Sequence, residues 1–148
     1  RSAWLAVGGM DEDYFCYQED VDLGFRLRLN GHECWHVADA VCRHMGSALT
    51  GKRSDFTTYH GQRNLVWTYV KNMPGALFWL LWPGHLLLNV VAVLFFTVKG
   101  QAAVVWRAKR DALLALPHVW RKRRAIQGRR SASLSAIWRW LDKSWLPR

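Results

Sequence analysis

An acidic pair, Glu19 and Asp20, precedes the apolar positions of segment 20–31. If that segment is a helix, both carboxylates lie at its N-terminus, where the helix dipole favours the ionised form. An ionised carboxylate at neutral pH can remove a proton from a hydroxyl as a general base. Spacing alone also favours a purely structural interpretation, because acidic residues are common helix caps. The sequence therefore offers Asp20 as a candidate base, with capping as the alternative.

Other positions have residue types suited to ligand binding. Gly8 and Gly9 follow a short predicted strand and would let the backbone approach a ligand closely. His44 ends a predicted apolar strand just before the turn at 45–47, a position where site residues gather. Arg63 comes four positions after Tyr59 on a predicted helix, although an ordinary helix surface is the better explanation of that spacing alone.

The cysteines and histidines of residues 32–44 do not have the spacing of a zinc site. Cys-x-x-Cys is missing, and these side chains alternate along the sequence. We expect Cys34 and Cys42 to be small buried thiols. The odd cysteine count of 3, without a signal-peptide pattern, argues against a secreted disulfide scaffold and favours a reducing compartment.

The elements that would position these residues are predicted as a mixture of helices and strands. Residues 21–29 alternate in hydrophobicity, as strands do, but Asp20 as a cap and Gly31 as a stop favour a helix. Residues 32–37 and 40–44 are predicted as short strands around 38–39. Ser54, as a cap, begins a predicted helix that ends before Pro74.

Charge and composition divide the chain near residues 73–75. The 148 residues are 51% hydrophobic, which excludes disorder, and the net charge of +10 points to an anionic partner. Residues 1–60 carry a net charge of −3 (6 bases and 9 acids), whereas residues 61–148 carry +13 (15 bases and 2 acids). We therefore predict two domains, 1–73 and 74–148.

The second part is predicted to associate with a membrane. Residues 76–98 lack Asp, Glu, Lys and Arg, and about 20 apolar residues suffice to cross a bilayer. Pro83, Gly84, His85 and Asn89 interrupt this run, so a bent, re-entrant or interfacial helix pair competes with a single span. A buried core helix is a further alternative. Basic residues interleaved with Trp and Leu over 100–130 fit an anionic membrane surface, with Lys71 and Lys99 flanking the apolar run. Nucleic acid is not expected as a partner, because only the net charge suggests it.

Four motifs in order resemble a glycosyltransferase of family 2, in the rhamnosyltransferase and galactofuranosyltransferase-like branch. They are Val-Gly-Gly-Met-Asp-Glu-Asp-Tyr-Phe, Glu-Asp-Val-Asp-Leu-Gly-Phe-Arg, Ala-Asp-Ala-Val-Cys-Arg-His and Tyr-x-x-x-Arg-Asn. The resemblance implies the C-terminal portion of an α/β, GT-A type nucleotide-diphospho-sugar transferase domain, followed by apolar and basic amphipathic helices. It also implies inverting transfer from a nucleotide-sugar donor to a saccharide or lipid-linked acceptor in cell-surface polysaccharide synthesis.

The resemblance also assigns roles to residues. Asp20 matches the base that acts on the acceptor hydroxyl, and Glu19 would support it. His44 matches a ligand of a divalent metal, Mn²⁺ or Mg²⁺, and Arg63 resembles an arginine near the donor diphosphate. Gly8 and Gly9 would line the acceptor side.

One part of the family pattern is missing from this sequence. The family's Asp-x-Asp metal motif precedes the Gly-Gly turn, whereas Asp11 and Asp13 follow it. The chain is therefore expected to be an incomplete fragment, inactive alone, at the cytoplasmic face of the cell membrane. A non-enzymatic, basic membrane-surface adaptor is the alternative function.

Overall fold

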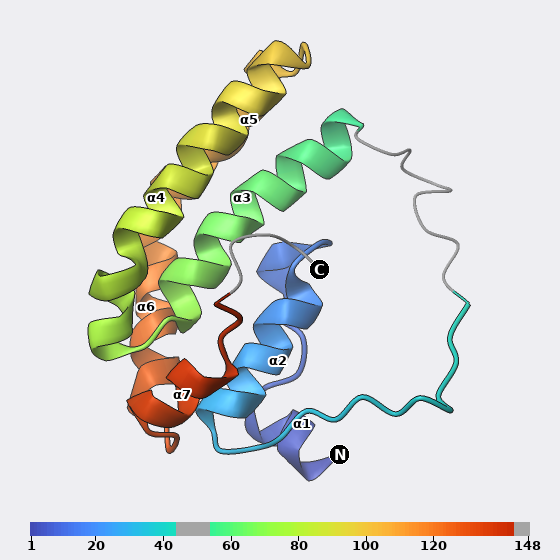
Figure 1. Ribbon diagram of the computed structural model, residues 1–148, viewed down its shortest axis with the longest axis vertical. Coiled ribbons are helices and arrows are strands. Elements are labelled where there is room, and N and C mark those ends of the chain that lie inside the picture. The colour runs from blue at the N-terminus through green and yellow to red at the C-terminus, as the bar shows by residue number, and fades with distance from the viewer. Residues whose placement is uncertain (44–53, 144–148) are drawn as a thin grey trace.

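The computed structural model describes residues 1–43 and 54–143, and within these residues it is helical without a β-strand (Figure 1). The elements in chain order are α1 (Ser2–Ala6), a 3₁₀ turn η1 (Glu12–Tyr14), α2 (Glu19–Leu29), α3 (Asp55–Asn72), α4 (Gly75–Val98), α5 (Ala102–Leu114), α6 (Leu116–Gly128) and α7 (Leu134–Trp140).

The α/β prediction is wrong for the described residues. Val7, expected in a strand, is the C-cap of α1, and residues 32–43 form irregular chain with one turn. Figure 1 shows this segment leaving the helices, so no neighbouring strand satisfies its backbone groups. Cys34 and Cys42 are exposed on it, which corrects the expectation of buried thiols.

Helix α2 is present, but its N-terminus differs from the prediction. The N-cap residue is Gln18, in the left-handed conformation with φ of 70° and without a side-chain cap bond. Asp20 lies inside the first turn instead, so the predicted capping role is wrong. The predicted stop is confirmed, because the helix ends at Leu29 and Gly31 has a φ of +81°.

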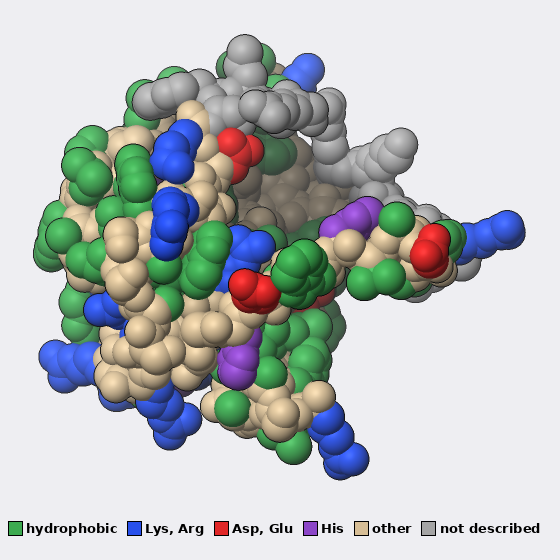
Figure 2. Space-filling model, turned by 60° about the horizontal axis from the view of Figure 1, so that its bottom comes forward, with side chains coloured by type: hydrophobic (Ala, Val, Ile, Leu, Met, Phe, Trp, Pro, Cys, Tyr) green, Lys and Arg blue, Asp and Glu red, His purple; other side chains and the backbone are tan. Residues whose placement is uncertain are grey.

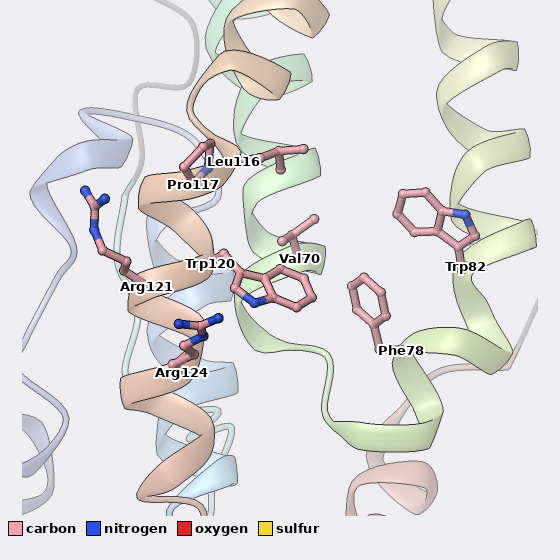
Figure 3. A pocket seen from close by; sticks show the side chains of 8 residues that line it. All are labelled: Val70, Phe78, Trp82, Leu116, Pro117, Trp120, Arg121 and Arg124. Atoms are coloured by element: carbon pink, nitrogen blue, oxygen red, sulfur yellow. The ribbon is translucent and has the colours of Figure 1, made fainter.

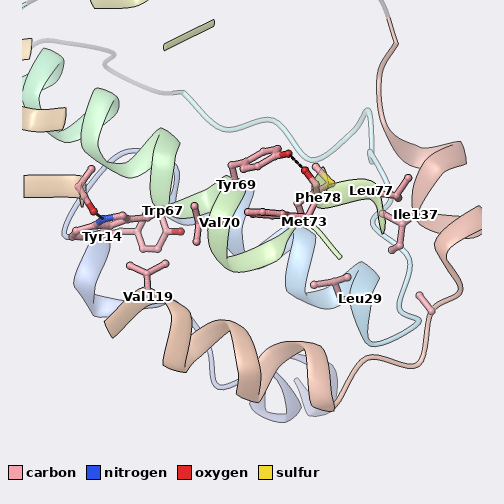
Figure 4. Close-up of a cluster of buried hydrophobic side chains, with 12 residues drawn as sticks. Tyr14, Leu29, Trp67, Tyr69, Val70, Met73, Leu77, Phe78, Val119 and Ile137 are labelled. Carbon is pink, nitrogen blue, oxygen red and sulfur yellow. Dashed lines mark hydrogen bonds between the residues drawn. The ribbon is translucent and has the colours of Figure 1, made fainter. Parts of the chain in front are cut away.

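Helix α3 is confirmed and occupies the centre of the structure. Ser54 caps it by accepting a hydrogen bond from the backbone N of Thr57 at 3.2 Å. Its sides pack against α2, α4, α5 and α6. The buried cluster includes side chains from both predicted domains, among them Leu29, Trp67, Phe78, Val119 and Ile137 (Figure 4). The division at residues 73 and 74 stays a prediction, but both segments contribute to this one core.

Helix α4 is continuous through Pro83 and is long and apolar enough to cross a membrane. Only 11% of its most apolar 18-residue window is buried, so among the described residues it is not a core helix. The interruption at Pro83 does not make a hairpin. Instead the chain reverses at Gly100, with a φ of +82°, and α5 packs back against α4 and α3.

Candidate functional site

A strained loop leads into the Glu19–Asp20 pair. Three of its four residues have a positive φ of 61° to 70°, although none is glycine: Phe15, Tyr17 and Gln18. Such conformations cost roughly 1–3 kcal/mol each and persist only when the surroundings enforce them. Here the Asn64 side chain, from α3, enforces them: its Nδ2 donates to the carbonyl oxygens of Tyr14, Cys16 and Tyr17 at 3.0, 2.8 and 2.9 Å.

The loop presents the two acidic side chains differently. Asp20 is exposed, and its carboxylate accepts a hydrogen bond from the backbone N of Val21 at 2.8 Å. Glu19 is half-buried, and its Oε2 is enclosed without a hydrogen-bond partner among the described residues. Asp20 is therefore the one of the two carboxylates that solvent, or a ligand, can reach freely.

Arg63 packs against η1, directly before this loop. Its guanidinium donates to the backbone oxygens of Asp13 and Tyr14 at 3.1 and 3.3 Å and lies 4.2 Å from the ring centroid of Trp67. Burial raises the pKa of the Cys16 thiol, the charge of Glu19 raises it further and the charge of Arg63 lowers it. Arg63 and Glu19 are thus both close enough to this thiol to act on its charge. The structure brings these two predicted site residues together.

Beneath the loop, α2 is anchored by a buried carboxylate that sequence reasoning did not assign to the site. Asp22, 0% exposed, accepts from Arg26 Nε at 2.8 Å and from Asn72 Nδ2 at 2.7 Å. Lys71 Nζ lies 2.7 Å from Asp22 Oδ1, the oxygen that also accepts from Asn72. The i,i+4 spacing of Asp22 and Arg26 predicted their ion pair. Nothing in the sequence predicted that Lys71 would join it. Lys71 was expected to flank a membrane helix, but it is buried, with 1% of its surface exposed.

The Gly8–Gly9 turn is tied to this anchor. Arg26 donates from Nη1 to the carbonyl oxygen of Val7 at 2.6 Å and from Nη2 to that of Gly9 at 2.7 Å. Both glycines have a positive φ, and a Cβ on Gly9 would lie 2.9 Å from Nε1 of Trp4. The turn and α2 are therefore one framework joined through a single guanidinium.

Asp11 and Asp13 are engaged by cations. Lys71 Nζ lies 2.5 Å and Lys122 Nζ 2.6 Å from the Asp11 carboxylate, while His118 Nε2 lies 2.6 Å from Asp13. Burial alone would raise the pKa of Asp11, but hydrogen bonds from Lys122 and Lys71 overcome it and lower the pKa to about 2. These two aspartates act here as ion-pair partners that join the first 20 residues to α3 and α6.

The predicted metal ligand, His44, lies outside the described residues. Among the residues that are described, no three His, Cys, Asp or Glu side chains are grouped as a metal site requires. The metal site therefore stays a prediction.

Comparison with known proteins links the chain to a glycosyltransferase. It is 48% identical over 52 residues to N-acetylglucosaminyl-diphospho-decaprenol L-rhamnosyltransferase of Mycobacterium tuberculosis, in strain CDC 1551 / Oshkosh and in strain ATCC 25618 / H37Rv. The match covers 35% of this chain and 17% of the relative. No family model and no solved structure matches.

Proposed function

We propose that this chain contributes the acceptor-activating part of a glycosyltransferase, with Asp20 as the general base. The whole protein would transfer a sugar from a nucleotide-sugar donor to a saccharide or lipid-linked acceptor, with inversion, in cell-surface polysaccharide synthesis. The observation that carries the proposal is the strained loop over residues 15–18, which Asn64 holds in place and which presents an exposed carboxylate at a helix N-terminus. The partial identity to a rhamnosyltransferase supports the same class of reaction.

The proposed step is a single displacement. The Asp20 carboxylate takes the proton of the acceptor hydroxyl while the oxygen of that hydroxyl forms a bond to the anomeric carbon of the donor. The bond from that carbon to the diphosphate breaks, and the nucleoside diphosphate leaves with the electron pair. Glu19 supports the base, Arg63 would face the donor diphosphate and the Gly8–Gly9 turn would line the acceptor side.

The proposal includes a divalent metal, Mn²⁺ or Mg²⁺, for which His44 is the one proposed ligand in this chain. The described carboxylates with Asp-x-Asp spacing, Asp11 and Asp13, are held by Lys71, Lys122 and His118, so they do not fit a metal in this arrangement. Residues 1–7, which precede the Gly-Gly turn, contain no aspartate. We therefore expect the 148-residue chain by itself to show no sugar transfer.

We also propose that α4 lies against the cytoplasmic face of the cell membrane rather than crossing it. Its outer side chains are apolar and exposed, for example Leu87 at 57% and Val91 at 52%, and Figure 2 shows exposed hydrophobic and basic side chains on one face of the molecule. Helix α5 packs beside α4 and exposes Arg107 and Arg110. A crossing α4 would draw these cations into the hydrocarbon at about 2.5–3.5 kcal/mol each or more.

The transfer proposal is tested on the complete protein that contains this chain. Membranes carrying it are supplied with a nucleotide-activated rhamnose and an N-acetylglucosaminyl-diphospho-polyprenol, and the lipid product is measured. We expect a rhamnosylated lipid from the complete protein and none from the 148-residue chain alone. Transfer by the chain alone would contradict the incomplete-site proposal. A complete protein inactive with every nucleotide sugar offered would favour the membrane adaptor.

A further inference from the structure

An aromatic pocket with two arginines opens between α3, α4 and α6. Its volume is about 480 Å³ and its walls come from Val70 of α3, Phe78 and Trp82 of α4, and Leu116, Pro117 and Trp120 of α6, with Arg121 and Arg124 on the α6 side (Figure 3). The ring centroid of Phe78 lies 5.9 Å from that of Trp120, edge to face, and 5.7 Å from that of Trp82. Trp82 and Trp120 remain 37% exposed, so the rings border solvent.

The four consecutive basic residues 121–124 have separate tasks. Lys122 pairs with Asp11, as described above, and also with Asp13. Arg123 is buried and donates to the backbone oxygens of Val70 and Met73 at 2.7 and 2.5 Å. These two residues therefore hold α6 against the rest of the fold and are not available to a ligand.

The other two basic residues of this run, Arg121 and Arg124, line the pocket. Among the described residues, Arg121 hydrogen-bonds to the imidazole of His118 at 3.3 Å, and neither Arg121 nor Arg124 makes an ion pair. Residues three apart on a helix share a face. Figure 3 shows Arg124 beside Trp120, whereas the Arg121 guanidinium is turned away from the rings at the rim of the pocket. The pocket thus has an apolar aromatic floor and two exposed arginines on its α6 side, and neither arginine pairs with a described carboxylate.

We propose that this pocket binds the phosphate headgroup of an anionic membrane phospholipid. Guanidinium groups are well matched to phosphate oxygens, and tryptophan rings favour the boundary between headgroups and hydrocarbon. Phe78 and Trp82 lie in the first half of α4, so the helix's exposed apolar side chains, which include Leu86, Val90 and Leu94, begin beside the pocket. A lipid with its phosphate on the arginines can lay its acyl chains along that surface, which a free anion or a nucleic acid cannot use.

This inference deepens the proposed membrane association and is independent of sugar transfer, so it is tested without an activity assay. The protein is sedimented with phosphatidylcholine vesicles that do or do not contain phosphatidylglycerol. The test variant is Arg121→Gln with Arg124→Gln. The control, Arg129→Gln with Arg139→Gln, removes the same charge from exposed arginines that do not line this pocket. Circular dichroism checks that both variants fold.

We expect the pocket variant to bind phosphatidylglycerol vesicles roughly thirty-fold more weakly, because each basic residue at an anionic surface contributes about 1 kcal/mol. The control should lose no more than about three-fold, because Arg129 and Arg139 lie outside the pocket and the attraction of a charge to the surface falls off within a Debye length. Equal losses in the two variants would mean that diffuse charge attracts the protein, and would overturn the site. Full displacement from vesicles by millimolar inorganic phosphate would overturn the lipid assignment in favour of a free-anion site.

Discussion

Two aspartates in the first turn of α2 have opposite surroundings. Asp20 is exposed, whereas Asp22 is fully buried and is contacted by Arg26, Lys71 and Asn72. The same chemical change at the two positions should therefore have different effects. Asp20 is accessible to a substrate, whereas Asp22, two positions later, holds the helix in place through its buried contacts.

We predict that Asp22→Asn destabilises the fold strongly and Asp20→Asn does not. Removing one partner of a buried ion pair typically costs about 3–5 kcal/mol, because the remaining charges are left uncompensated. The comparison is made by thermal unfolding, with the exposed Asp39→Asn as control. Equal melting temperatures for the Asp22 and Asp39 variants would refute the anchoring role.

The pKa of Asp11 predicts a loss of stability in acid. Its pKa falls from 3.8 to about 2 in the folded state, so the folded state binds this proton less readily than the unfolded state. The stabilisation is fully present above pH 3.8 and is lost as the pH falls toward 2. Denaturant unfolding of the wild type and Asp11→Asn should therefore show a stability difference at neutral pH that narrows across this range. A difference independent of pH would contradict the ion-pair account.

At the scale of elements, the sequence predicted the helices better than the strands. Capping by Ser54 and the stop at Gly31 depend on neighbouring residues, and both were confirmed. The segments 32–37 and 40–43 have strand-like alternation, but a strand also needs a partner to satisfy its backbone groups, and the described residues offer none. Whether a strand finds a partner depends on distant parts of the chain, and a local alternation of apolar and polar residues does not predict it.

Helix α4 carries a prediction of its own. Leu87 and Val91 are exposed and lie one turn apart on α4. Replacing both by Glu should leave the melting temperature nearly unchanged and reduce vesicle binding at least about ten-fold, because apolar area and lipid attraction are lost together. Leu77→Glu, at a buried position of the same helix, should instead unfold the protein. Unchanged vesicle binding by the Leu87 and Val91 variant would exclude α4 as the membrane face.

At the scale of the whole molecule, the candidate site was only partly predictable. The sequence indicated the Glu19–Asp20 pair and Arg63, and the structure places Arg63 and Glu19 beside the same thiol. It did not indicate that Asn64 enforces the loop or that Lys71 is buried between Asp11 and Asp22. Those contacts join residues 47 to 60 positions apart, a separation that no local pattern encodes.

The central claim, that Asp20 is the base of sugar transfer, is tested most directly by one turnover measurement. The complete protein is assayed for transfer to the polyprenol-linked acceptor as wild type, Asp20→Asn and the control Asp39→Asn, with equal amounts of folded protein. Loss of a general base should lower turnover roughly a hundred-fold or more in the Asp20 variant, with the control near wild type. Wild-type turnover by Asp20→Asn would contradict the account and leave Asp20 as an ordinary surface residue.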